Sequence, residues 1–268
     1  MTEHRAPVLL SGATNHDDLL RGSPSGSDHG SDRREQAPRF RLGGPWLSVV
    51  TFVLSTVLPA LIVGWRISLG IAVLILIHEM GHWLTARHLG LHPGLPVLIP
   101  FLGGFVLTDA ESVNDWERAL VALAGPATGT LGSVLFTLGG FLVSSGTLVT
   151  LGTVGLILNL LNLLPVLPFD GGWSAAAIDR RLWLLGFAGV VTLVWGGLVE
   201  WWILPFIALG ALQMYFLRGE RNSDEVRSRR STPLQRVAIG GIHIAIVILP
   251  LVFISVVFPT VWGQIHGA

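Results

Sequence analysis

The sequence contains no cysteine and no lysine, and only 13% of its 268 residues are charged. Without cysteine, disulfide frameworks and thiolate metal sites are excluded, so any metal ion must be bound by His, Asp or Glu. The 17 basic residues, all Arg, balance 17 acidic ones, so no net basic field favours nucleic acid as a partner. With 51% hydrophobic residues and a mean hydropathy of +0.64, the chain has too little polar surface to cover a globule. We therefore expect a polytopic membrane protein of the all-α class.

Apolar segments of membrane-spanning length begin only after residue 44. Residues 1–44 are rich in Ser, Gly, Asp and Arg, and their one apolar run is VLL at 8–10, which is too short for a signal peptide core. We expect a disordered cytoplasmic tail there. A bilayer core about 30 Å thick requires about 20 apolar residues in a helix. On this criterion about seven transmembrane helices are predicted, at residues 46–64, 67–88, 119–144, 148–168, 182–198, 201–217 and 234–258.

Arginine is concentrated in the loops that share one side of the membrane with the amino terminus, above all in the loop at 218–233. Basic loops stay in the cytoplasm, so we expect a multi-pass protein of the cell membrane with a cytoplasmic amino terminus. The predicted organisation is a membrane-embedded core of about six spans at 45–217, a basic cytoplasmic loop at 218–233, and an additional transmembrane helix with a short tail at 234–268.

The loop between the second and third spans, about 92–110, is apolar but is interrupted by Pro and Gly in LHPGLPVLIPFLGGFV. It is too broken for a spanning helix and too apolar for a loop in water. Irregular backbone at membrane depth is tolerated only where protein or a wet cavity satisfies its polar groups. We therefore expect a re-entrant or β-hairpin loop, whose unpaired strand edge can accept another chain.

Three ionisable residues lie inside the second span, in LILIHEMGH. His78 and His82 are four residues apart, so on a helix they point the same way and can bind one ion, while Glu79 is displaced around the helix. This HExxH pattern is typical of zinc sites in which the Glu is the general base. The alternative is a set of polar core residues paired among themselves, but ionisable groups in a span indicate function by default. We predict a Zn2+ site in the inner half of the bilayer.

A catalytic zinc ion needs a third protein ligand, and Asp170 is the best candidate. It follows the fourth span in NLLPVLPFDGG, where prolines break the helix and Gly171 and Gly172 allow close backbone approach. A plain helix-end or turn role for Asp170 is the alternative. Asn162, one to two turns earlier, could hydrogen-bond substrate or serve as an ordinary helix-end residue, and Asn159 could do the same with weaker support.

Other candidates for the third ligand are less favoured. His88 has the spacing of the third His of soluble metzincins, but Thr85 replaces the Gly that would turn the chain there. Asp109 and Glu111 are expected to be solvated, and His243 is expected to be a packed polar residue. In the third span, Gly125, Gly129, Ser133 and Thr137 recur every four residues, which predicts a smooth face for helix packing and a structural role.

The order of these motifs resembles the site-2 protease family of intramembrane zinc metalloproteases. HEMGH in a span, PFLGGFV in a hairpin, ALAGP at the start of the next helix and NLLPVLPFDGG after a later one are all similar to that family, over residues 65–175. The resemblance implies that His78, His82 and Asp170 bind zinc, that Glu79 is the general base and that Asn162 lies near the substrate. It further implies cleavage of single-span membrane proteins, such as anti-sigma factors or membrane-tethered transcription regulators.

Two departures from the family pattern are visible. No segment is long and polar enough for a PDZ or CBS domain, so we expect the form without them, and Phe169 stands where Leu is usual. Two other functions remain open at this point. A metal-ion transporter could use the same His, His and Asp, and a protease-like binding protein could keep the fold without hydrolysis. A transporter has no need for Glu79 beside the metal, and no inverted repeat is evident.

Overall fold

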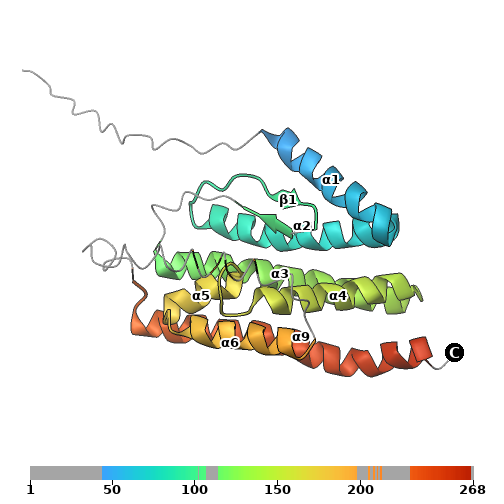
Figure 1. Ribbon diagram of the computed structural model, residues 1–268. Coiled ribbons are helices and arrows are strands. Elements are labelled where there is room, and N and C mark those ends of the chain that lie inside the picture. Colours follow the sequence, from blue (N-terminus) through green and yellow to red (C-terminus); the bar gives the residue numbers. More distant parts are fainter. Residues whose placement is uncertain are drawn as a thin grey trace, which may run out of the picture. The chain divides into compact units, whose positions relative to one another are not determined.

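The computed structural model describes residues 44–101, 103–106, 114–197, 205, 208, 210, 212 and 230–266. These residues are mostly helical, as expected (Figure 1). Their elements are α1 (Pro45–Val63), α2 (Trp65–His88), β1 (Val97–Ile99), β2 (Gly103–Phe105), α3 (Asp115–Leu142), α4 (Gly146–Asn162), α5 (Asp170–Ile178), α6 (Leu182–Trp195) and α9 (Pro233–His266).

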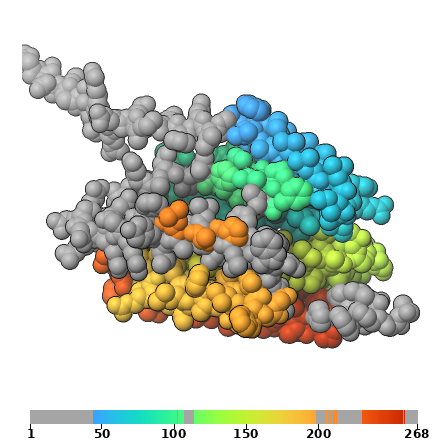
Figure 2. Space-filling model, in the orientation of Figure 1, coloured from blue at the N-terminus to red at the C-terminus, as the bar shows by residue number. Residues whose placement is uncertain are grey.

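Four of the described helices are long and apolar enough to cross a membrane: α1, α2, α3 and α9. None of the side chains of α1 is buried, and Figure 2 shows this helix at the surface, where its apolar residues suit a lipid environment. Helices α4 and α6 have 17 and 14 residues. At 1.5 Å per residue they span about 26 and 21 Å, less than the hydrocarbon core. The seven spans therefore stay a prediction.

The last helix continues to His266 and not only to the expected residue 258. The fourth helix ends at Asn162 and not near residue 168. Pro165 has no N–H for the helix ladder and disfavours helical backbone before it, so the chain leaves the helix and re-enters one only at Asp170. The expected span at 201–217 lies outside the described residues apart from four isolated positions. The predicted tail, apart from Gly44, also lies outside them, as do Asp109, Glu111 and most of the basic loop.

Helix α3 is the centre of the helical arrangement, because it packs against α2, α4, α5 and α9 (Figure 1). Its start is set by a capping box: the Asn114 side chain accepts the Glu117 N–H, and the Glu117 carboxylate accepts the Asn114 N–H. Thr128 and Thr137 of α3 donate to carbonyls one turn earlier, and Thr128 Oγ1 also lies 3.3 Å from the Ile77 carbonyl of α2. This contact lies one residue before His78.

Small residues allow α3 and α4 to approach closely. Gly152 of α4 faces Thr137 and the Ser133 carbonyl of α3 so closely that a Cβ atom would overlap both. Ser133 and Thr137 are themselves fully buried and donate to carbonyls one turn earlier in α3. The expected smooth face of the third span is therefore buried against its neighbours.

An antiparallel β-hairpin lies in the loop between α2 and α3. Strand β1 pairs with β2 in the register Val97↔Phe105, Leu98↔Gly104 and Ile99↔Gly103. Strand β1 packs on α1, where the Leu98 N–H donates to Thr51 Oγ1 at 3.3 Å, and β2 packs on α2. The hairpin therefore lies over the half of α2 that carries the His pair.

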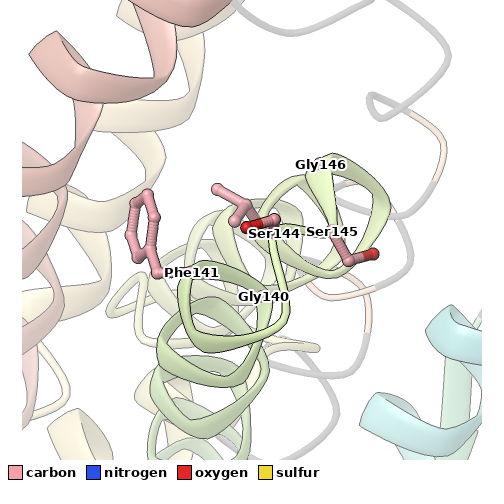
Figure 3. Close-up of a pocket in the computed structure, with 6 residues that line it drawn as sticks. Gly140, Phe141, Ser144, Ser145 and Gly146 are labelled. Carbon is pink, nitrogen blue, oxygen red and sulfur yellow. The ribbon is translucent and has the colours of Figure 1, made fainter.

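A pocket of about 250 Å³ lies at the turn between α3 and α4 (Figure 3). It is lined by Gly140, Phe141, Ser144, Ser145, Gly146 and Val149. Along α3, the distance from Gly125 to Gly140 corresponds to about 22 Å at the helical rise. This pocket is therefore remote from the HExxH residues.

We predict that Gly152→Ala destabilises the protein by about 1–3 kcal/mol, because the methyl group must push α3 and α4 apart. Gly139→Ala is the matched control, since a Cβ atom at Gly139 meets nothing within 4 Å. There the gain in helix propensity should make the change neutral or stabilising by up to about 1 kcal/mol. Thermal unfolding in detergent measures both, and equal shifts for the two variants would contradict close packing at Gly152.

Candidate metal centre

Three acceptor atoms from two distant segments meet beside α2. His78 Nε2 lies 3.1 Å from His82 Nε2 and 3.0 Å from Asp170 Oδ2, and His82 Nε2 lies 3.4 Å from the same carboxylate oxygen. The His pair lies on one face of α2, as the four-residue spacing predicts. Asp170 is the first residue of α5. The structure therefore brings together the three residues that were proposed as ligands.

Each imidazole is held by a bond from its other ring nitrogen. His82 Nδ1 lies 2.8 Å from the Val121 carbonyl of α3, and His78 Nδ1 lies 2.8 Å from Asn159 Oδ1 of α4. Because both partners are oxygen acceptors, each Nδ1 carries the proton and each neutral ring has its lone pair on Nε2. Both lone pairs then face each other and the Asp170 carboxylate.

Asp170 is placed by the segment that links α4 to α5. A Cβ atom at Gly171 would overlap the Leu163 carbonyl, and one at Gly172 would lie 2.6 Å from the Leu167 nitrogen. The predicted close approach at these glycines is confirmed. The Trp183 indole N–H of α6 also donates to the Gly172 carbonyl at 2.7 Å, which ties the first turn of α5 to α6.

Glu79 lies beside the three acceptors and beneath the hairpin. It is 4% exposed, and its Oε2 is buried with no hydrogen-bond partner among the described residues. A Cβ atom at Gly104 would lie 2.7 Å from Glu79 Cγ and 2.9 Å from its Oε1, so only glycine lets β2 approach this side chain. A buried carboxylate oxygen without a partner is costly, which indicates that it is reserved for a ligand, a substrate or water.

Among the described residues, the remaining candidates form no hydrogen bond with this cluster. His88 is exposed at the end of α2, and His243 of α9 lies 2.7 Å from Ser174 Oγ, as expected of a packed polar residue. Asn162 is the last residue of α4 and is partly buried. Within the described part of the chain, no hydrogen bond links its side chain to the His pair.

Two residues have contacts with the site that were not expected from the sequence. Asn159, and not Asn162, contacts His78. Gly125 was expected to serve helix packing alone, yet a Cβ atom there would overlap the His82 imidazole. The sequence feature that could have indicated Asn159 is its position inside an apolar helix, where a polar side chain needs a hydrogen-bond partner. Asn162 lies at a helix end, where its side chain can bond to free backbone groups.

These residues fit a tetrahedral metal ion. His78, Glu79 and His82 are all buried and their ligand atoms lie within 4.8 Å of one another, so they could hold a metal. The triangle formed with Asp170 is tighter, with edges of 3.0, 3.1 and 3.4 Å. Zinc bonds of about 2.0–2.2 Å at tetrahedral angles separate neighbouring ligands by about 3.3–3.6 Å. A small expansion of the triangle therefore suits zinc.

The fold and the cluster define a helical protein that has helices long and apolar enough to cross a membrane and a candidate His/His/carboxylate metal centre. Residues 66–147 match the family model described as peptidase family M50, so the resemblance to site-2 proteases is confirmed over this part of the chain. The match contains HExxH, the hairpin and all of α3, and it ends before Asp170. No curated protein matches the chain.

We predict that Gly125→Ala strongly weakens metal binding, because its methyl group would occupy the space of the His82 imidazole and displace Nε2. The same substitution at Gly139, on the same helix with open space around it, should bind metal as the wild type does. Isothermal titration with zinc on metal-stripped protein compares the two. Equal zinc affinity for Gly125→Ala and wild type would show that the ring of His82 is not part of the centre.

Proposed function

We propose that this protein is an intramembrane zinc metalloprotease that hydrolyses peptide bonds within or near transmembrane segments of membrane-tethered substrates. The observation that supports this is the convergence of two imidazole lone pairs and a carboxylate oxygen at 3.0–3.4 Å, next to a buried glutamate with an unpartnered oxygen. Three acceptors at such distances repel one another unless a cation lies among them. A single shared proton satisfies only two of them, whereas a divalent ion satisfies all three.

In this proposal His78, His82 and Asp170 bind the zinc ion, and Glu79 does not. A zinc ion held there would act as a Lewis acid, which would polarise a peptide carbonyl and lower the pKa of nearby water. Asp170 is preferred to Glu79 as the third ligand because its oxygen already lies within 3.4 Å of both Nε2 atoms.

Glu79 is then the general base. Its carboxylate takes a proton from the attacking water as the water oxygen bonds to the peptide carbon, and it passes that proton to the nitrogen as the C–N bond breaks. The products are a carboxylic acid and an amine, and Glu79 ends as it began. Burial beneath β2 keeps this carboxylate away from bulk solvent and leaves one oxygen free for water.

The hairpin offers a means of holding the substrate in extended form. The Leu98 N–H points away from β2, toward Thr51, so its partner Gly104 also directs its backbone groups away from β1. In the described residues no third strand pairs with β2, so these groups lie along an open edge next to Glu79. A transmembrane helix must unwind before its carbonyls can be attacked, and pairing with this edge would stabilise the unwound segment. Asn162 would contact the same segment.

The proposed substrates are single-span membrane proteins, such as an anti-sigma factor or a membrane-tethered transcription regulator, cut in regulated intramembrane proteolysis. We place the protein in the cell membrane as a multi-pass protein with its amino terminus in the cytoplasm and its active site in the inner half of the bilayer. The basis for this is the arginine distribution and the four helices of spanning length.

We predict that Glu79→Gln lowers the rate of peptide cleavage by about 10²–10⁴-fold while zinc stays bound, because the amide keeps the shape but accepts no proton. Cleavage of a panel of single-span substrates by purified protein in detergent, with zinc content measured in parallel, tests this. A metal-ion transporter or an inactive relative would show no cleavage in the wild type. Unchanged cleavage in Glu79→Gln would remove the proposed base.

We predict that Asp170→Ala lowers zinc affinity more than about 100-fold, a larger loss than removal of a residue that only supports a ligand. Asp179→Ala is the matched control, because Asp179 is the exposed residue directly after α5. Titration of metal-stripped protein with zinc gives both affinities. If Asp170→Ala binds zinc like the control, Asp170 is not a ligand and the proposed division of roles fails.

A further inference from the structure

Asn159 is a polar side chain enclosed by three helices. It lies on α4, is 4% exposed, and contacts α2 through its Oδ1, which is 2.8 Å from His78 Nδ1. Its Nδ2 donates to the Gly155 carbonyl of α4 at 2.7 Å. Both ends of the amide therefore have partners.

The Gly155 bond decides which way the amide faces. A carbonyl oxygen can only accept, so the group next to Gly155 must be the NH₂ of Asn159. The Oδ1 then faces His78, and His78 must donate from Nδ1 to that oxygen. In the neutral ring this leaves the lone pair on Nε2, the nitrogen that lies 3.0 Å from Asp170 and 3.1 Å from His82.

Helix α3 prevents the amide from moving away. A Cβ atom at Gly129 would overlap Asn159 Oδ1, so the backbone of α3 lies directly against this side chain. His82 is held differently, because its Nδ1 bonds to the main-chain carbonyl of Val121. The two imidazoles thus depend on different supports, and only that of His78 is a side chain that substitution can change.

We propose that Asn159 is a positioning residue for the metal ligand His78. Its fixed amide selects the ring rotation and the Nδ1–H tautomer that aim Nε2 at the centre formed with His82 and Asp170. This inference rests on the proposed zinc site. Residues that hydrogen-bond to metal-bound imidazoles typically contribute about 10–100-fold to metal affinity.

The test is zinc affinity in three variants of the full chain. Asn159→Leu keeps the volume but removes the acceptor, and we expect zinc affinity to fall about 10–100-fold. Asn159→Asp keeps an acceptor for His78, so its affinity should equal or exceed that of the wild type. Thr153→Val is the control: it removes a polar group of α4 whose hydroxyl donates to the Val149 carbonyl, about 9 Å along the helix from Asn159, and it should bind zinc normally.

A second readout needs no metal. In metal-free protein with ¹⁵N-labelled histidine, the signal of His78 should report the Nδ1–H tautomer in the wild type and in Asn159→Asp, and a mixture of tautomers in Asn159→Leu. The His78→Gln variant identifies the signal by its loss. A role in packing alone would change thermal stability in Asn159→Leu without changing this tautomer.

Several results would overturn the inference. The first is a zinc affinity in Asn159→Leu that equals that of the wild type. The second is an equal loss of zinc affinity in Asn159→Leu and Asn159→Asp, because this would show that the hydrogen bond to Gly155, and not the one to His78, supports zinc binding. If Asn159→Leu does not fold, Gly129→Ala displaces the same amide without altering it and should lower zinc affinity in the same range. Failure of the wild type to bind zinc would defeat both proposals, whereas normal binding in Asn159→Leu defeats this one alone.

Discussion

The structure depends on one electrostatic constraint: three acceptor atoms, held in an apolar protein interior, point at a common centre. Each acceptor is fixed from behind, the two imidazoles by oxygen atoms of α3 and α4 and the carboxylate by the turn that starts α5. Rotation of the rings to relieve the repulsion would break those bonds in a region with few alternative partners. The protein therefore maintains a site that is favourable only with positive charge inside it.

Close helix packing is the means by which this constraint is met. The glycines of α3 lie directly against the residues that form the centre, Gly125 against the His82 ring and Gly129 against the Asn159 amide. A larger side chain at either position would fill the space that these groups occupy. Gly81 of α2 fits against Ala124 and Thr128 in the same way. Small residues of α2 and α3 thus determine how closely these helices pack and where the polar side chains of the site can fit.

The parts of this arrangement that the sequence predicts are those governed by local geometry. The helical period places His78 and His82 on one face, and the prolines and glycines around Asp170 indicate a broken helix with tight backbone contacts. The parts that it does not predict depend on how two helices are rotated against each other. Asn159 and Asn162 differ by three residues, less than one turn, and only the packing of α4 on α2 and α3 decides which faces His78. The contact of Gly125 with His82 cannot be predicted from the sequence for the same reason, because it depends on how α3 is rotated against α2.

The site combines one rigid element with one that depends on long-range packing. His78, Glu79 and His82 keep their relative positions wherever α2 is helical. Asp170 reaches them only if the chain leaves α4 at Asn162, crosses the Pro-containing segment and packs Gly171 and Gly172 against it. An ion bound by both elements would be linked to that packing, because a ligand that binds only the assembled state stabilises it. The proposed zinc ion would then connect α2 to α5 as well as supply the chemistry of the proposed reaction, because the break after Asn162 is what allows Asp170 to reach the His pair.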